Sequence, residues 1–313
     1  MKIFLNGELV DEDQARVSVF DSGFVLGDGV WEGLRVVDGQ PAFLGPHLDR
    51  LFEAARTIML EIGLDRRSLT EAIYQTINAN GLVNDAHLRL MVTRGIRRQP
   101  YQDPRLALGQ ATVVIVPALS PHDPEKAARG LDLFTVHVRR GPPDVQDQKI
   151  NSHSKFNCIM ACIQANQAGA DEALMLDPRG FVATCNSTHF FIVRSGELWT
   201  SAGGYCLGGI TRGNVLRLCH DNGIPALEKD FSLTEVYGAD EAFVTGTLGG
   251  LTPVRQIDGR RLPGERPGPV TARLQGLYRD LIKQDVAAQA RRGDGRRETE
   301  TGNRKPETVN RKP

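Results

Sequence analysis

Apolar and polar positions follow two different periods along this chain, and the changes of period predict its elements. Short alternating runs joined by glycine turns, such as Asn6-Gly7, indicate strands near the N-terminus. From Leu48 to Ile62 the apolar residues recur three and four positions apart, as in a helix with one buried face. In the first 117 residues the pattern predicts strands within 3–45, 87–93 and 112–117, and helices over 48–62 and 68–80.

Three prolines between Pro117 and Pro124 stop both helix and sheet, so we expect an interdomain linker at 118–128. This linker would divide the chain into a smaller domain of residues 1–117 and a larger domain of residues 129–285. In the larger domain we expect strands over 131–138, 173–176, 189–193, 197–200 and 241–246, and helices from 156 onward, over 213–222 and over 270–284.

The last segment, residues 286–313, has a different composition. It carries eight Lys or Arg and four Asp or Glu, and it contains the tandem repeat ETGNRKP-ETVNRKP. So polar a segment cannot bury enough apolar area to order itself, and we expect a disordered tail. Mixed charge without aromatic side chains also argues against a nucleic-acid site in this tail.

Composition and charge exclude several classes of protein. The chain has 313 residues with an ordinary 40% hydrophobic content, and its formal net charge of zero gives no overall attraction to nucleic acid or to a membrane. No apolar run reaches the roughly 18–20 residues of a membrane span, and the first residues lead into a hairpin turn without a signal peptide. Five cysteines without CxxC spacing indicate free thiols in a reducing cytoplasm and no metal site.

The strongest chemical signal lies in residues 181–212. Two predicted strands precede Gly208-Gly209-Ile210-Thr211-Arg212, which opens a helix. Paired glycines let the backbone approach a ligand, and the free N–H groups of Ile210 and Thr211 lie at the positive end of the helix dipole, which favours a phosphate. A second block, Thr245-Gly246-Thr247, ends another predicted strand with two hydroxyl groups.

These two blocks, together with Glu32-Gly33-Leu34-Arg35 and His47-Leu48-Asp49-Arg50-Leu51, resemble the class IV (fold type IV) aminotransferases over about residues 3–283. The resemblance implies pyridoxal 5′-phosphate (PLP) as the cofactor. It also implies a set of phosphate-binding residues: Arg50, Ile210, Thr211 and Thr247. The guanidinium group of Arg50 can offer two parallel hydrogen bonds to phosphate oxygens.

The lysine that the family uses for its Schiff base with PLP is less plainly matched. Lys155 stands just before a predicted helix that ends in Ala-Gly-Ala-Asp-Glu-Ala. Counted back from that end without gaps, the family lysine falls on Asn151, four residues or about one helical turn before Lys155. A local deletion in the loop would bring Lys155 to the same point, so we favour Lys155 as the catalytic lysine, with Lys149 as the competitor.

Thr184 departs from the family pattern, because the family carries a glutamate there that contacts the ring nitrogen of PLP. A threonine supplies no negative charge, so the resemblance places Thr184 at the ring nitrogen but predicts a largely neutral pyridine. Slow transamination, or another reaction, would follow. A second departure is His189, which replaces a family asparagine.

The N-terminal half is expected to supply the substrate side of the site. Trp31 and Arg35 flank the Glu-Gly-Leu block, and Arg89 matches an arginine of the branched-chain enzymes. Leu248, directly after the second phosphate block, is placed on the substrate side as well. The Arg-x-His pair of the D-amino-acid enzymes is absent after Thr93-Arg94-Gly95.

The resemblance implies a two-domain α/β (α+β) fold, with a small N-terminal α/β domain, a larger C-terminal β-barrel-like domain with helices, and PLP between them. It implies a homodimer that transfers an amino group between an α-amino acid, of the branched-chain type by preference, and a 2-oxo acid such as 2-oxoglutarate. Three alternatives stay open: a D-amino-acid transaminase, a PLP-dependent lyase of the same fold, and a PLP-binding protein without turnover.

Overall fold

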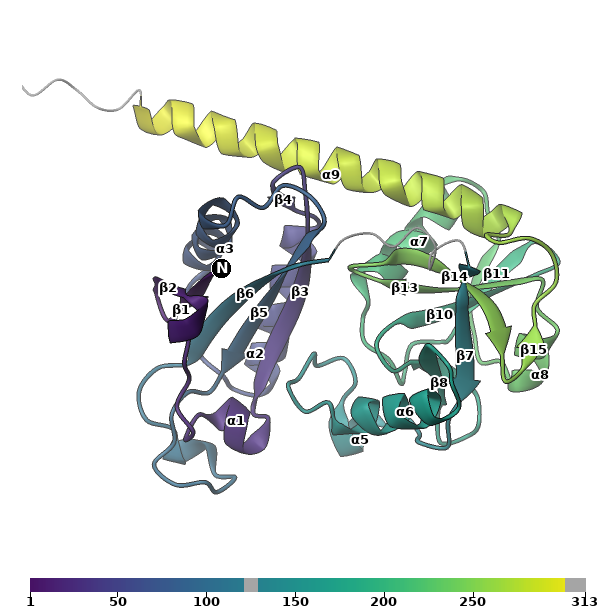
Figure 1. The fold of residues 1–313 in the computed structure, drawn as a ribbon, viewed down its shortest axis with the longest axis horizontal. Helices are drawn as coiled ribbons and strands as arrows, with labels where there is room; N and C mark the ends of the chain where they lie inside the picture. The colour runs from purple at the N-terminus through teal and green to yellow at the C-terminus, as the bar shows by residue number, and fades with distance from the viewer. Residues whose placement is uncertain (121–128, 302–313) are drawn as a thin grey trace, which may run out of the picture.

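The computed structural model describes residues 1–120 and 129–301, with side chains up to residue 291. Two lobes lie side by side, and one long C-terminal helix lies across both of them (Figure 1). Most of the predicted linker, residues 121–128, lies outside the described residues. The chain therefore divides into two halves on either side of that segment, and each half is built around its own sheet.

The N-terminal lobe is a mixed α/β unit whose sheet has the strand order β2-β1-β6-β5-β3-β4. Its elements are β1 (Lys2–Leu5), β2 (Glu8–Asp11), α1 (Ser22–Leu26), β3 (Gly29–Val37), β4 (Gln40–Pro41), α2 (Leu44–Thr57), α3 (Arg66–Ala79), β5 (Ala86–Thr93) and β6 (Thr112–Leu119). Alternate residues of β3 and β5, such as Leu34 and Leu90, pack with α2 and α3 in one apolar core. The opposite face of these strands carries Trp31, Arg35 and Arg89 in neighbouring register positions.

The C-terminal lobe is built on a sheet in the order β12-β11-β10-β13-β14-β7-β8-β9, with β15 beside β14. Its elements are β7 (Leu131–Thr135), α5 (Pro143–Gln146), α6 (Phe156–Gln167), β8 (Glu172–Leu176), β9 (Val182–Cys185), β10 (His189–Arg194), β11 (Glu197–Thr200), α7 (Ile210–Asp221), β12 (Ala226–Glu228), α8 (Leu233–Tyr237), β13 (Glu241–Gly246), β14 (Gly250–Ile257), β15 (Arg260–Arg261) and α9 (Pro269–Thr301). Strand β9 also contacts β10, so the sheet curls into a partly closed barrel.

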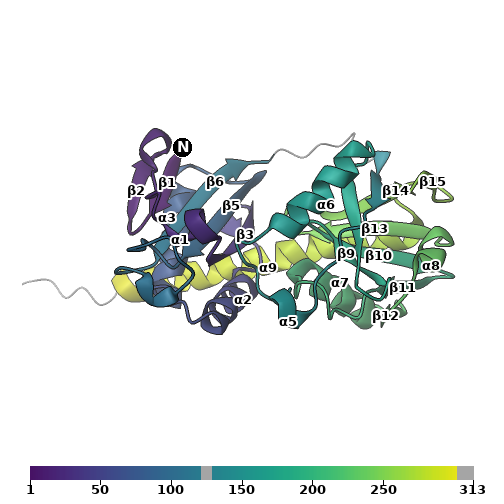
Figure 2. The ribbon, with the colours of Figure 1, turned by 90° about the horizontal axis from the view of Figure 1, so that it is seen from below.

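Three apolar clusters hold this lobe together. One fills the inside of the curled sheet and includes Leu174 and Phe190. The outer face is covered in two places: α7 and α9 pack against Phe191 and Phe243, and the small residues of α6 pack against β8. Figure 2 shows α6 and α7 in the same lobe, with α9 running on past it to the other lobe. The predicted small α/β domain and larger barrel-like domain with helices are thus confirmed.

Helix α9 ties the two lobes together. Asp285 of α9 accepts a hydrogen bond of 2.6 Å from the backbone N–H of Phe43, and Gln289 donates one of 3.1 Å to the carbonyl of Pro41. Val286 is buried in the same cluster as Phe43. The helix continues to Thr301, so residues 286–301, where the sequence predicts a disordered tail, are helical. The remaining tail residues, 302–313, lie outside the described residues.

The described part of the chain contains no helix that combines the length and the apolar composition needed to cross a membrane.

Candidate active site

The first wall of the candidate site is the N-terminus of α7. Gly209 is the N-cap residue, and Ile210 and Thr211 form the first turn. The hydroxyl of Thr211 is buried and lies 3.2 Å from the hydroxyl of Tyr278 on α9. Gly209 packs directly on the imidazole of His189, and a Cβ at this position would collide with that ring. Only glycine fits there, which explains the second glycine of the Gly-Gly block.

The second wall is the end of β13. His189 of β10 pairs with Thr245, so both side chains lie on the outer face of the sheet, where α7 packs. The hydroxyl of Thr245 is buried and has no hydrogen-bond partner among the described residues. Thr247 follows two positions later and is half-buried. A buried hydroxyl beside a helix N-terminus that lacks a partner can donate to an oxyanion such as phosphate.

The start of α7 and the end of β13 form the two walls of a phosphate cup, and Arg50 closes this cup from the N-terminal lobe. Its side chain is only 13% exposed, and its Nε and Nη2 atoms donate to the two carboxylate oxygens of Glu32 at 2.8 and 2.6 Å. The remaining nitrogen, Nη1, donates to the carbonyl oxygen of Gly208 at 2.7 Å. The structure therefore brings Arg50 to the Gly-Gly turn, as the phosphate prediction requires.

Lys155 lies at the junction of the two lobes. It is the N-cap residue of α6, and its Nζ atom is 5.6 Å from the centre of the Trp31 ring on the other lobe. Burial, aided by the positive charges of Arg140, Arg89 and Arg50 and opposed by Cys158, lowers the pKa of Lys155 to about 8. A lysine in this state is a far better nucleophile at neutral pH than an exposed one.

The two alternatives to Lys155 lie elsewhere. Asn151 is buried, and its backbone and side chain form a reciprocal pair with Trp31: the Trp31 N–H donates to its carbonyl at 2.9 Å, and its Nδ2 donates to the Trp31 carbonyl at 2.7 Å. Lys149 is exposed, and its Nζ donates to the carbonyl of Gly203 at 2.7 Å. Asn151 thus fixes the segment against β3, and four residues later the amine of Lys155 lies near the Trp31 ring of that strand.

Thr184 faces the outer side of the curled sheet because of a β-bulge. The pairing of β8 with β9 shifts between Met175 and Leu176, so that Ala183 is an extra residue and Thr184 lies opposite Met175. Met175 packs under α6, and Thr184 therefore points to the same outer face as the cup. Its hydroxyl donates to the carbonyl of Thr188 at 2.7 Å, so its proton is already engaged in the turn that follows.

His189 is kept uncharged. Burial lowers its pKa to about 4, a hydrogen bond with the Leu207 carbonyl partly opposes this, and the charges of Arg212, Arg50 and Arg140 lower it further. The 2.8 Å contact of Nε2 with that carbonyl requires the proton on Nε2. The imidazole is therefore a neutral wall of the cup.

The substrate side consists of the exposed face of β3 and β5. The guanidinium of Arg89 stacks on the Trp31 ring at 3.8 Å, and burial lowers the pKa of Arg89. The Trp31 indole N–H donates to the carbonyl of Ser152 at 3.1 Å, which fixes the ring at the lobe junction. Burial raises the pKa of Tyr278, the charge of Arg35 partly opposes this rise, and the Tyr278 hydroxyl lies 3.2 Å from that of Thr211. Leu248 is 42% exposed.

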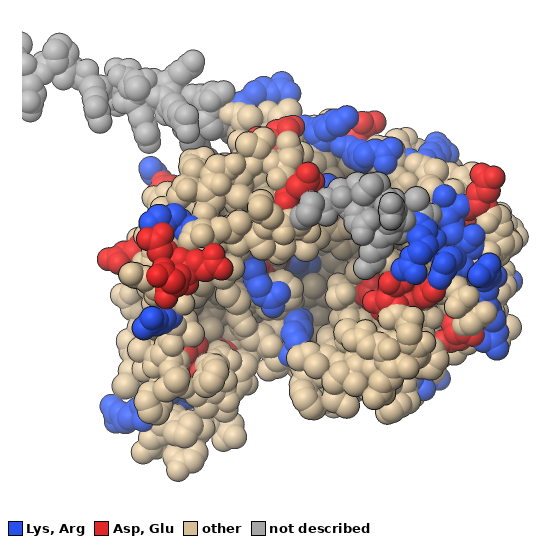
Figure 3. All heavy atoms as spheres, in the orientation of Figure 1, with Lys and Arg blue, Asp and Glu red and all other residues tan. Residues whose placement is uncertain are grey.

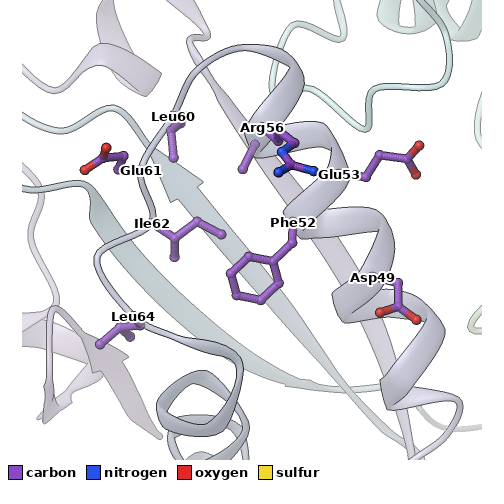
Figure 4. Close-up of a pocket in the computed structure, with 9 residues that line it drawn as sticks. Asp49, Phe52, Glu53, Arg56, Leu60, Glu61, Ile62 and Leu64 are labelled. Carbon is purple, nitrogen blue, oxygen red and sulfur yellow. The ribbon is translucent and has the colours of Figure 1, made fainter.

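Lys and Arg side chains gather in a hollow between the two lobes (Figure 3). A different depression, an open groove of about 620 Å³, lies beside α2 and the segment that follows it (Figure 4). Phe52, Leu60 and Ile62 give it an apolar lining. Its three carboxylates, from Asp49, Glu53 and Glu61, outnumber the one arginine, Arg56, and would repel a phosphate. We therefore place the site in the hollow between the lobes.

Comparison with known proteins gives the class of protein. The amino-transferase class IV family matches residues 29–257. A branched-chain-amino-acid aminotransferase of Pseudomonas aeruginosa is 35% identical over 296 residues, which cover 92% of this chain and 95% of that protein. A D-alanine aminotransferase of Listeria monocytogenes is 32% identical over 293 residues, which cover 91% and 97%.

Solved structures agree. A branched-chain amino acid aminotransferase (T.th.), crystallised with pyridoxamine 5′-phosphate, superposes with a TM-score of 0.84 at 30% identity and covers 90% of this chain and 93% of that one. The chain belongs to the class IV aminotransferases, and it is a PLP-dependent transaminase. The predicted family, enzyme class and cofactor are confirmed. The individual site residues remain predictions.

The structure also adds residues that the sequence did not single out. Glu32 and His47 form a buried pair behind Arg50, and Tyr278 meets Thr211 from α9. The sequence did contain a sign of Glu32. Alternate residues of this strand are buried, and Glu32 is a charged residue at one of these buried positions, between the apolar Val30 and Leu34. Tyr278 had no such signal, because its helix reaches the cup only through the fold.

Proposed function

We propose that this enzyme transfers an amino group between a branched-chain α-amino acid and a 2-oxo acid such as 2-oxoglutarate, with Lys155 as the lysine that binds PLP. One observation carries the proposal: the amine of Lys155 lies 5.6 Å from the centre of the Trp31 ring on which Arg89 stacks, and burial, with the charges of Arg140, Arg89 and Arg50, lowers its pKa to about 8. Relatives named branched-chain aminotransferases support the substrate class.

The residues fit the cofactor. Arg50, the first turn of α7, Thr247 and the unpaired Thr245 hydroxyl would hold its phosphate. When bound, PLP supplies an aldehyde that exchanges with amines and a ring that withdraws electrons from the substrate Cα. Lys155 would accept and return the Cα proton, and the Trp31 ring and Arg89 would orient the substrate against the β3–β5 face.

Absorbance and trapping test this function. The protein with PLP should show a visible band that a branched-chain amino acid bleaches and that a 2-oxo acid restores. Borohydride reduction followed by peptide mapping should place PLP on Lys155. A band that no amino acid bleaches would indicate binding without turnover, and a label on Lys149 would refute the assignment of Lys155.

A PLP-dependent lyase is the second candidate, and Thr184 favours it. A hydroxyl whose proton is donated to Thr188 offers the ring nitrogen no negative charge, which weakens the electron withdrawal that transamination needs. Release of pyruvate from an amino acid with a leaving group at Cβ, without a 2-oxo acid acceptor, would separate this activity from transamination.

We also propose that the enzyme is a homodimer in a reducing cytoplasm. Helix α6 leaves an apolar stripe uncovered, in which Phe156, Ile159 and Ile163 are 75%, 53% and 43% exposed. The five cysteines are free, which suits a reducing compartment. Sedimentation equilibrium should give twice the chain mass, and Phe156→Glu should shift the protein toward monomer while Leu119→Glu, at a residue 64% exposed on β6, should not.

A further inference from the structure

The core of the N-terminal lobe contains a carboxylate that its fold does not need. Glu32 occupies the centre of β3 in the buried phase of the strand, between Val30 and Leu34, and all three side chains are 0% exposed. Burying an ion among apolar side chains costs several kcal/mol unless it is paired. An apolar residue would fill this position without that cost, so the carboxylate has to be explained by its partners.

Those partners come from a single face of α2. His47 and Arg50 are three residues apart, so their side chains project side by side. The Nδ1 atom of His47 lies 2.6 Å from one oxygen of Glu32, and Arg50 binds both oxygens. Burial raises the pKa of Glu32, but hydrogen bonds from His47 and Arg50, with their charges, outweigh it and hold the pKa below its usual range. Glu32 is therefore an anion at neutral pH.

The pair fixes Arg50 in one orientation. With Nε and Nη2 both bound to the same carboxylate, the plane of the guanidinium is set by Glu32. Nη1 and the second N–H of Nη2 take no part in this pair, and Nη1 meets the carbonyl of Gly208, one residue before the N-cap of α7. A chain of hydrogen bonds thus runs from the core of one lobe to the phosphate cup of the other.

We propose that Glu32 and His47 are positioning residues for the phosphate of the cofactor. They hold the Arg50 guanidinium at the Gly208-Gly209 turn, so that affinity for the phosphate depends on a carboxylate buried in the opposite lobe. This inference rests on the proposed role of Arg50 in the cup. In Glu32→Gln the amide keeps the shape of the side chain but replaces one acceptor oxygen by a donor, which frees the guanidinium to turn away.

The test compares PLP with pyridoxal, which lacks the phosphate. The dissociation constants of both are measured by quenching of tryptophan fluorescence. The dissociation constant of pyridoxal divided by that of PLP reports the contribution of the phosphate alone. Loss of one or two charge-assisted hydrogen bonds should reduce that ratio about 10- to 100-fold in Glu32→Gln. General damage to the fold would weaken both ligands alike and leave the ratio unchanged.

Three matched variants sharpen the test. Asp132→Asn breaks a similar carboxylate–arginine fork, with Arg255 of the C-terminal lobe, and should leave the ratio unchanged. His47→Leu removes one donor to Glu32 but keeps the pair with Arg50, and should lower the ratio, whereas His47→Asn keeps an N–H in a similar place and should restore most of it. As a readout without cofactor, stabilisation of the protein by inorganic phosphate should fall in parallel.

The outcomes separate this inference from the proposed function. If the unmodified protein does not prefer PLP to pyridoxal, or if Arg50→Lys leaves the ratio unchanged, the phosphate cup itself is wrong. If Arg50→Lys lowers the ratio but Glu32→Gln leaves it unchanged, the positioning role is overturned while the cup stands. Should Glu32→Gln not fold, His47→Leu decides the matter, and an unchanged ratio in that variant overturns the inference.

Discussion

The lowered pKa of Lys155 leads to a quantitative prediction. With a pKa of about 8 in place of 10.5, about a quarter of the Lys155 side chains are neutral at pH 7.5, against about one in a thousand for an ordinary lysine, which is a difference of about 250-fold. Only the neutral amine is a nucleophile. The rate at which Lys155 reacts should therefore rise with pH and level off above about pH 8.5 to 9.

Competitive acetylation of the protein without PLP measures this directly. Brief treatment with acetic anhydride at a series of pH values, followed by quantitative peptide mapping, should give a midpoint near pH 8 for Lys155. Lys283, which is 74% exposed on α9, serves as the reference amine in the same samples. Because Arg140 adds a positive charge nearby, Arg140→Gln should move the midpoint upward.

The same shift predicts how stability depends on pH. The folded protein releases the Lys155 proton near pH 8 and the unfolded chain near 10.5, so between these values the unfolded state binds more protons. The free energy of unfolding should therefore gain a rising contribution across this window, and Lys155→Met should remove it. A midpoint above about pH 10 in the acetylation experiment, or no effect of Arg140→Gln, would refute the reasoning about burial and charge.

Three further predictions concern the cup, the bulge and the lysine. Thr211→Ala should weaken PLP binding by about 0.5–1.5 kcal/mol in equilibrium dialysis, whereas Ile210→Ala, which keeps its backbone N–H, should have little effect; equal losses would count against the cup. Thr184→Val should destabilise the protein by about 0.5–1.5 kcal/mol in urea, since it removes one of the two donors to the half-buried Thr188 carbonyl, which keeps the Cys185 N–H, and no change would mean that the hydroxyl is not bound there. In Lys155→Ala the covalent attachment of PLP should be lost. Adding Asn151→Lys should not restore the attachment, because the side chain at position 151 is buried against β3. If the attachment were restored, position 151 would be the family's lysine position.

Much of the fold follows from local patterns. The apolar stripe of α2, the strand alternation of β5 and the Gly-Gly block at the start of α7 each depend on neighbours within one or two turns. Strand β5 starts one residue before its predicted position, whereas α2 was predicted over 48–62 and covers Leu44–Thr57. The prediction failed for residues 286–301, because a polar sequence gives no local sign that Val286 and Gln289 dock against the other lobe. That docking stabilises the helix at Asp285, Val286 and Gln289.

By itself the sequence indicated the class of the protein through its resemblance to a known family. It also predicted the parts of a phosphate cup, because glycines, hydroxyls and a helix start act through the backbone at fixed spacing. It did not decide which residue occupies the lysine position, since a count along the chain gives Asn151 and a shift of one turn gives Lys155. The tertiary structure places the side chains: pairing of residue 151 with Trp31, 120 positions earlier, buries Asn151, and the amine of Lys155 lies 5.6 Å from the centre of the Trp31 ring. The contacts of Glu32 also depend on the tertiary structure. Only the fold brings Glu32 of β3 and the carbonyl of Gly208 to the two sides of the Arg50 guanidinium.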